Sequence, residues 1–292
     1  MDYSIYENVY AGMLKASQEL SCPKQTLELQ YHFDPQLEQV ISRYRLKEVA
    51  GECSDSQKII RMVQWIALHC FHNGEFDNHI EPCADKLLEF SFDKDKEHGI
   101  NCLNLSITLA ECLLGLGIKA RAMSIMPMSP YDRDNHVVCE AYASDLNKWI
   151  MVDPTYGGYV TDENGTILNL LELRNLLADL KTPVYCGYQY NGGEVNFEFL
   201  TAYYAKDLYF LECSQIQGYR SKTAPNNPRL IFAPVGFDAK NWLAASLQES
   251  LNRLEKAGKA TDELRRKFAE RLNSYAPIAQ NINILYQESV HE

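Results

Sequence analysis

The stretch LNLSITLAECLLGLG, residues 103–117, is almost entirely apolar and is long enough for about four turns of a helix. Asn101 precedes it, and asparagine is among the residues that best cap a helix N-terminus. Gly115 and Gly117 stand at its far end, where glycine allows the left-handed conformation in which helices end. The sequence therefore predicts a short buried helix, around which other elements must pack.

Three runs typical of β-strands follow this helix along the chain. They are residues 119–126, 136–143 and 148–155. The turn residues 144–147 separate the last two runs, which predicts an antiparallel hairpin. We therefore expect an α+β fold in which a central helix packs on an antiparallel sheet.

The flanking regions divide the chain into three parts. Residues 1–50 are predicted to form an N-terminal helical segment, and residues 51–165 form the core, which begins with an amphipathic helix over 56–71. Residues 166–292 are expected to form an α/β extension continuous with the core. Within this extension the aromatic-rich run VNFEFLTAYY, residues 195–204, favours a strand.

Composition argues against several classes of protein. The formal net charge of −11 over 292 residues opposes a sequence-independent grip on nucleic-acid phosphates and disfavours binding to anionic membranes. No stretch reaches the ~18 consecutive apolar residues of a membrane-spanning helix. The N-terminal residues lack the basic and apolar regions of a signal peptide, and the nine cysteines are scattered, as expected of reduced thiols. These features favour a cytoplasmic protein with no nucleic-acid or membrane partner.

The two cysteines of the predicted helix differ in their expected chemistry. Cys102 lies in the first turn, where unpaired backbone N–H groups and the helix dipole favour a thiolate, the nucleophilic form of cysteine. Cys112 lies in the middle of the helix among leucines, where nothing stabilises a negative charge. Cys102 is therefore the candidate nucleophile, and the alternative for both residues is an unreactive buried thiol.

A nucleophilic thiol needs a base, and the base needs a group that orients it. His136 begins one strand of the predicted hairpin and Asp153 ends the other, so we expect their side chains to lie close together at its open end. There an aspartate can fix the tautomer of the imidazole. Cys102, His136 and Asp153 form a candidate triad. The alternative is a surface histidine and a turn aspartate before Pro154.

Together these motifs resemble the transglutaminase-like superfamily, the papain-like cysteine enzymes of transglutaminase-core type. The resemblance covers about residues 54–160 and rests on four segments in order. They are Gly99 to Cys102, Gly117-Ile118-Lys119-Ala120-Arg121, His136 to Tyr142, and Trp149 to Thr155. The chain departs from the pattern at its glycine, which lies three residues before the cysteine, and at Val137-Val138, where many members have Ala-Trp.

The resemblance implies Cys102 as nucleophile, His136 as general base and acid, and Asp153 as the orienting residue. It also implies acyl transfer through a thioester, with no cofactor or metal, on a peptide, a protein or a small amide. The expected activity is that of a cysteine peptidase or amidase; the alternatives are an amine-accepting acyltransferase and a catalytically inert binding module. The family's oxyanion hole uses the nucleophile's N–H and a side-chain donor, for which His72 and Asn73 are candidates.

A rival interpretation concerns the histidines and cysteines between residues 69 and 83. The potential zinc ligands there are His69, Cys70, His72, His79 and Cys83. Their spacing matches no paired Cys-x-x-Cys or His-x3-His site, so we expect no metal centre in this stretch. The tyrosines concentrated over residues 185–209 are expected to pack within strands and the cleft.

Overall fold

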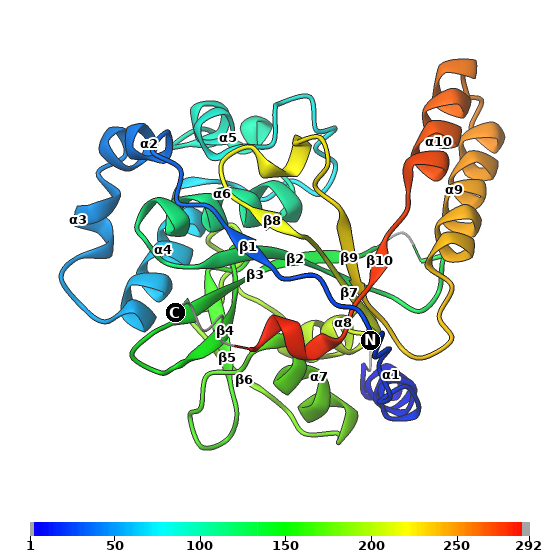
Figure 1. Cartoon of the computed structure of the whole chain (residues 1–292), viewed down its shortest axis with the longest axis horizontal. Coiled ribbons are helices and arrows are strands. Elements are labelled where there is room, and N and C mark those ends of the chain that lie inside the picture. Colours follow the sequence, from blue (N-terminus) through cyan, green and yellow to red (C-terminus); the bar gives the residue numbers. More distant parts are fainter. Residues whose placement is uncertain (1–2, 133, 288–292) are drawn as a thin grey trace.

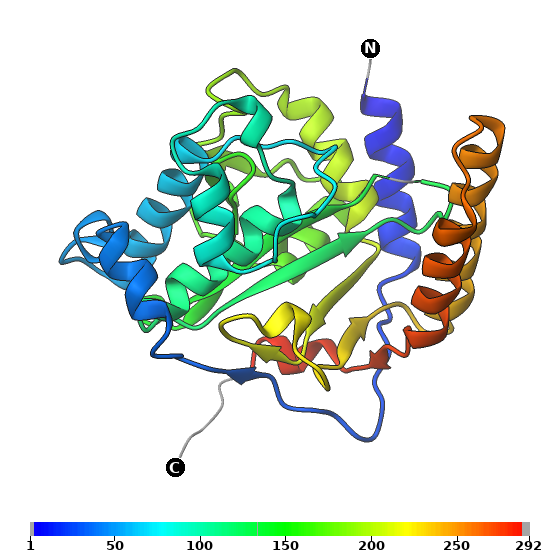
Figure 2. The same ribbon diagram turned by 90° about the horizontal axis from the view of Figure 1, so that it is seen from above.

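Residues 3–132 and 134–287 are described by the structure, which is a computed structural model. An eight-stranded sheet forms the centre of these residues, and helices cover both of its faces (Figures 1 and 2). The strand order is β10-β9-β7-β2-β3-β4-β5-β6. Only β9 and β10 run parallel in this sheet, and the other neighbours are antiparallel. The predicted α+β fold with an antiparallel sheet is confirmed.

The strands of this sheet include all three runs predicted after the apolar helix. They are β2 (Ala120–Met126), β3 (His136–Ala143), β4 (Lys148–Asp153), β5 (Gly158–Thr161), β6 (Val184–Cys186), β7 (Phe210–Ser214), β9 (Arg229–Phe232) and β10 (Ile278–Ala279). The predicted hairpin is the β3–β4 pair, in which Cys139 lies opposite Val152. A separate short pair joins β1 (Gln30–Tyr31) to β8 (Ile216–Gln217).

Two layers of helices enclose the sheet. The first layer is α2 (Leu37–Arg43), α3 (Leu46–Ala50), α4 (Asp55–His69), α5 (Ala84–Ser91) and α6 (Cys102–Gly115). The second is α1 (Ser4–Ala16), α7 (Leu170–Ala178) and α8 (Phe197–Asp207), on the opposite face (Figure 1). A hairpin of α9 (Ala239–Lys256) and α10 (Asp262–Ser274) stands at the β9 end of the sheet (Figure 2). No helix among the described residues is long and apolar enough to span a membrane.

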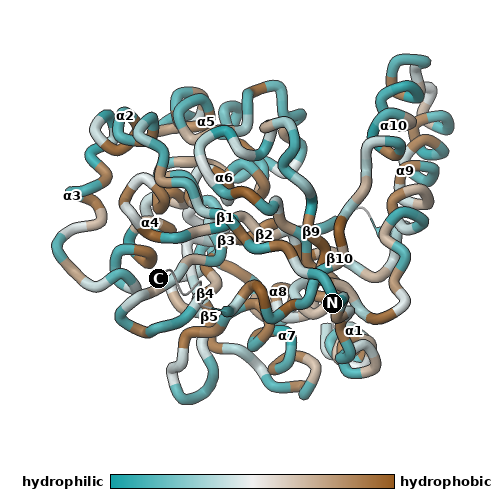
Figure 3. The backbone as a smooth tube through the Cα atoms, in the orientation of Figure 1, coloured by the Kyte–Doolittle hydropathy of each residue, from teal (hydrophilic) through white to brown (hydrophobic). Residues whose placement is uncertain are grey.

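Helix α6 is the apolar helix predicted from the sequence, and it lies against the centre of the sheet. The Asn101 side chain caps it by accepting a hydrogen bond from the Asn104 N–H. Gly117 takes a φ of 81° just beyond its end. The Ser106 hydroxyl donates to the backbone carbonyl of Val137 and ties the helix to β3. In Figure 3 the hydrophobic residues concentrate in these inner elements, whereas the outer helix α10 is mainly hydrophilic.

The strand predicted over residues 195–204 is wrong, because most of this run forms α8. Asn196 caps the helix by accepting from the Phe199 N–H. Leu200 and Tyr204, one turn apart, are completely buried against the sheet. Packing of this face outweighs the strand preference of the aromatic residues.

Residues 17–36 also differ from the predicted N-terminal helical segment, because they are mostly extended. The Ser21 N–H donates to the Ala233 carbonyl, and β1 pairs with β8. Pro23 and Pro35 oppose a helix through this stretch, since proline lacks the N–H that a helix needs. The chain therefore crosses the molecule here as a strap between α1 and α2 (Figure 2).

A buried ion pair lies at the centre of the sheet. Arg121 on β2 is directly opposite Glu140 on β3, and both side chains are fully buried, with 2.7 Å between Nη2 and Oε2. Arg121 also donates, through Nη1, a hydrogen bond to the Tyr31 hydroxyl of the strap. The Tyr286 hydroxyl, near the end of the described chain, donates to Glu140 Oε1. Segments from both ends of the chain therefore complete the surroundings of this pair.

Candidate active site

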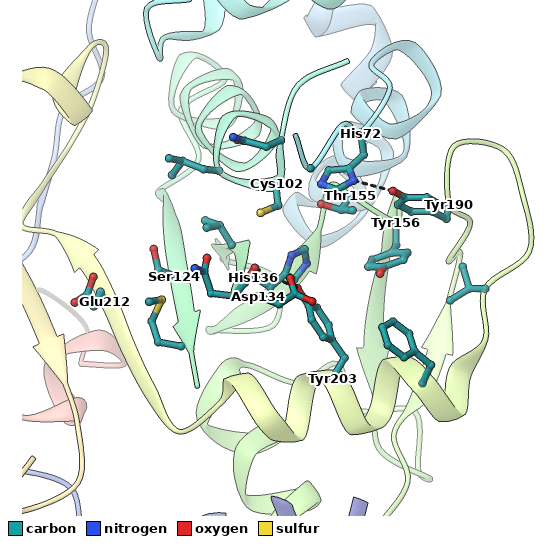
Figure 4. Close-up of a pocket in the computed structure, with 18 of the residues that line it drawn as sticks. His72, Cys102, Ser124, Asp134, His136, Thr155, Tyr156, Tyr190, Tyr203 and Glu212 are labelled. Carbon is teal, nitrogen blue, oxygen red and sulfur yellow. Dashed lines mark hydrogen bonds between the residues drawn. The ribbon is translucent and has the colours of Figure 1, made fainter. Parts of the chain in front are cut away.

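The first turn of α6 meets the ends of β3 and β4 at one edge of the central layer. This meeting brings together the three residues predicted as a triad, Cys102, His136 and Asp153, of which Figure 4 shows Cys102 beside His136. The His136 Nε2 lies 2.6 Å from Asp153 Oδ2. Because Nε2 is engaged by the carboxylate, Nδ1 is the ring nitrogen that remains available to the Cys102 sulfur, which interacts with this imidazole.

The charges of this group favour a thiolate beside an imidazolium. Burial opposes the Cys102 thiolate, but hydrogen bonds and charge interactions with His136 and His72 outweigh it and lower the pKa of Cys102 from 9.0 to about 6. Burial also disfavours a charged His136, but the Asp153 carboxylate and the Cys102 thiolate raise the pKa of His136 well above its ordinary value. At neutral pH the pair is therefore ionised, as a nucleophilic cysteine requires.

The Asp153 carboxylate is held in place by groups from two parts of the chain. Its side chain is fully buried. The Thr155 N–H donates to Oδ1 at 2.9 Å, and the Tyr204 hydroxyl donates to Oδ2 at 2.5 Å. The Tyr204 hydroxyl in turn lies 3.0 Å from that of Tyr188. Reasoning from sequence missed Tyr204, because the run that holds it was interpreted as a strand.

The two oxyanion candidates occupy different positions. His72 lines the same cavity as Cys102 and interacts with its sulfur, and its Nδ1 lies 3.0 Å from the Tyr190 hydroxyl. Asn73 lies in a local turn, where its side-chain oxygen accepts from the Glu75 N–H at 3.0 Å. The structure therefore brings His72, and not the Asn73 amide, to Cys102.

A group of asparagines braces the start of α6 against the loop that follows His72. Asn78, which has a φ of 59°, accepts hydrogen bonds through Oδ1 from the side chains of Asn101 and Asn104, at 3.0 and 2.7 Å. Because Asn101 also caps α6, these contacts fix the backbone on both sides of Cys102. Only the capping role of Asn101 was evident from the sequence.

A cavity of about 740 Å³ opens above Cys102. Figure 4 shows Cys102 next to His72 and His136, with Tyr156 and Tyr190 beyond the histidines and Ser124 and Glu212 on the opposite side of the sulfur. The predicted packing of tyrosines around the cleft is confirmed by Tyr190 and Tyr203, which line it. A cavity of this size accommodates a ligand much larger than a single amino-acid residue.

The other cysteines and histidines near this site either pair with nearby carboxylates or are buried as neutral thiols. His69 Nδ1 lies 2.6 Å from Asp93, and His79 contacts Asp77. Burial raises the pKa of the Cys70 thiol, and likewise that of Cys83, to about 12. Among residues 3–132 and 134–287, no three potential ligands come together in a way that could hold a metal ion. Burial also raises the pKa of Cys112 well above its ordinary value, in contrast to Cys102.

Comparison with known proteins gives one match. Residues 44–154 match the family model of the transglutaminase-like superfamily, which confirms the resemblance found in the sequence. The matched segment begins just after α2 and ends just after β4, so it contains Cys102, His136 and Asp153. Domains of this superfamily are in general cysteine-based enzymes. No curated protein and no solved structure matches the chain.

Proposed function

Given the transglutaminase-like core of residues 44–154, we propose that the chain is a cysteine-dependent hydrolase, a peptidase or amidase that acts through a thioester. One observation carries the proposal. A cysteine with a pKa of about 6 interacts with His136, whose Nε2 lies 2.6 Å from the buried Asp153 carboxylate. This is the arrangement in which a thiolate attacks, an imidazolium donates a proton and a carboxylate fixes the ring.

In the proposed reaction the Cys102 thiolate attacks the carbonyl carbon of an amide. A C–S bond forms, and the π electron pair of the carbonyl moves to its oxygen. When this oxyanion collapses, the C–N bond breaks and His136 gives its proton to the departing amine. The neutral imidazole then takes a proton from water as the water oxygen attacks the thioester. Collapse of the second intermediate releases a carboxylic acid and restores the thiolate.

Two donors are available for the negative oxygen of each intermediate. The Cys102 N–H is the first of α6 and has no partner within the helix. His72 is the second donor in this proposal. In this proposal the Tyr190 hydroxyl, 3.0 Å from His72 Nδ1, donates to that nitrogen, and the resulting tautomer carries its proton on Nε2. His72 is therefore proposed as the side-chain donor of the oxyanion hole.

We also propose that residues 51–165 and 166–292 act as one catalytic unit. Tyr204 and Tyr190 belong to the C-terminal part, and they contact Asp153 and His72 respectively. The continuous sheet supports the same view, because β6, β7 and β9 extend the strands of the core. A fragment that ends near residue 165 would lack these contacts.

A set of glutamine- and asparagine-containing peptides, followed by mass spectrometry, tests the proposed activity. Cys102→Ala is expected to reduce turnover by at least about a thousandfold, because it removes the nucleophile. Cys22→Ala, at an exposed cysteine, is the matched control and should be active. Full activity of Cys102→Ala would refute the proposal. Adding a primary amine separates the alternatives: a carboxylate product indicates a hydrolase, and an amine-linked product indicates an acyltransferase.

A further inference from the structure

The cavity above Cys102 continues as a groove across the sheet to α10. Ser124 on β2 and Glu212 on β7 are directly opposite each other in the sheet, and both line this cavity. Arg229 on β9 and Arg271 on α10 line its far part. Figure 4 shows Ser124 and Glu212 on the side of Cys102 that faces away from the tyrosines. The groove therefore joins the candidate nucleophile to a set of charged side chains.

These charged side chains carry an excess of positive charge. Arg229 Nε lies 3.6 Å from Glu212 Oε2, and the Tyr275 hydroxyl donates to the other oxygen of the same carboxylate. Within the described parts of the chain, neither Lys222 nor Arg271 forms an ion pair. Three basic side chains, Lys222, Arg229 and Arg271, therefore have the single carboxylate of Glu212 near them, in a protein whose net charge is −11.

The pKa of Lys222 is lowered in part by the same positive charges. Burial is the largest cause, and the nearby charges of Arg229 and Arg271 add to it, so that despite Glu212 the pKa of Lys222 falls from 10.5 to about 7. Lys222 lines a small cavity beside α6 together with Ser124 and Arg229, and Arg229 also lines the groove. An anion bound among these side chains would supply the missing negative charge.

We propose that Lys222, Arg229 and Arg271, here called the basic subsite, bind a carboxylate of the substrate. The identity of this ligand as part of a substrate rests on the proposed function. A carboxylate fits because Glu212 is the ion-pair partner of Arg229 alone, and because Lys222, with a pKa of about 7, is only partly charged at neutral pH, so that the charge left without an acidic partner is chiefly that of Arg271. The chain would then be selective for peptides that carry an acidic group at a fixed distance from the attacked carbonyl.

The sheet sets this distance. Neighbouring strands lie about 4.8 Å apart, so the three steps from β3 through β2 and β7 to β9 span about 14 Å. An extended peptide covers about 3.4 Å per residue. This span corresponds to about four residues of extended backbone, and the length of an acidic side chain shortens it, so the acidic group is expected at the third or fourth residue from the attacked carbonyl. It is either the side chain of Asp or Glu or the carboxylate at the end of the peptide.

Alkylating peptides can test the subsite through the rate at which they label Cys102. One series carries a chloromethyl ketone at its C-terminus and another a chloroacetyl group at its N-terminus, which places residues on either side of the reacting carbon. A single Glu, Gln or Lys is moved along an otherwise neutral sequence. Chloroacetyl peptides without Glu, ending in a carboxylate or an amide, separate the two sources of the acidic group.

In one of the two series, we expect the peptide with Glu at the third or fourth position to label Cys102 about tenfold faster than the peptide with Gln there. One charge-assisted contact provides a difference of this size. In the double variant Lys222→Ala, Arg271→Ala, the Glu and Gln peptides should label Cys102 at equal rates. In Arg271→Glu, the Lys peptide should label Cys102 fastest. Arg266→Ala is the matched control, since Arg266 lies on the same helix, pairs with Glu270 and is outside the groove. Equal rates for Glu and Gln at every position would overturn the proposal.

Iodoacetamide separates failure of the subsite from failure of the proposed function. This small reagent does not reach the basic subsite, so normal labelling of Cys102 by iodoacetamide without a preference for Glu refutes only the subsite. If neither reagent labels Cys102, the proposed function fails. The groove is then tested by the binding of fluorescein-labelled peptides without the reactive group: tighter binding of Glu than of Gln supports the subsite, and equal binding refutes it.

Discussion

Replacing His136 by alanine is expected to return Cys102 to the acidity of an ordinary thiol. In the intact site the pKa of Cys102 falls from 9.0 to about 6, despite burial, with His136 and His72 as the stabilising partners. At 1.36 kcal/mol for each pKa unit, the site favours the thiolate by about 4 kcal/mol. Without His136, burial still disfavours the thiolate, and the interaction that most strongly stabilised the thiolate is lost. We therefore expect a pKa of about 8.5 or higher, the value of a free cysteine or above.

The pH dependence of iodoacetamide labelling measures this change directly. The rate of Cys102 alkylation, followed by peptide mapping, should rise through about pH 6 in the unmodified protein. At pH 6 it should fall about a hundredfold in His136→Ala, because the thiolate fraction falls by that factor. His98→Ala, at an exposed histidine paired with Asp95, is the control and should leave the profile unchanged. A midpoint that stays near pH 6 in His136→Ala would refute the assignment of His136 as the main source of the acidity.

Three further predictions concern the site and the sheet that holds it, and the last of them compares two substitutions. Tyr204→Phe removes the hydroxyl that donates to Asp153, and we expect turnover to fall about tenfold with little loss of stability, as kcat/KM and thermal unfolding would show. Arg121→Met leaves a buried carboxylate without its cation, so urea unfolding should show a loss of about 3–5 kcal/mol; a loss below about 1 kcal/mol would contradict the ion-pair argument. Gly157→Ala and Gly165→Ala both place a Cβ at positive φ, of 68° and 82°. Only the first Cβ would collide with a side chain, at 2.7 Å, so Gly157→Ala should lower the Tm more.

The helix–hairpin part of the fold was predictable because each of its elements carries a local signal. Asn101 caps α6 in the structure as it does in the sequence pattern, and the β3–β4 turn falls at residues 144–147. Residues 195–204 were not predictable in the same way, since their strand preference is local and their helical packing is not. The strap over residues 17–36 likewise depends on distant partners such as Ala233 and β8.

The contacts of the candidate site also separate into those within a short stretch of chain, which the sequence predicts, and those between distant residues, which it does not. The juxtaposition of His136 and Asp153 follows from a hairpin between them, which is a short-range feature of the chain. Tyr204 reaches Asp153 from 51 residues away, and no periodicity in the sequence encodes that contact. His72 was a candidate only through its place after α4. Its side chain is directed by Tyr190, 118 residues away, which sequence reasoning had no means to pair with it.

The surroundings of the Arg121–Glu140 pair give the order of synthesis a role in folding. The ribosome makes Tyr31 before the buried pair and Tyr286 well after it, yet the Tyr31 hydroxyl accepts from Arg121 and the Tyr286 hydroxyl donates to Glu140. While the chain is still being made, the guanidinium and carboxylate of the core lack their last partner, and Asp153 lacks Tyr204 until α8 emerges. In a nascent chain that has not yet reached α8, Asp153 therefore lacks the Tyr204 hydroxyl that holds its carboxylate beside His136. The contacts around Asp153 are complete only after α8 has been made, later than the core residues 44–154 themselves.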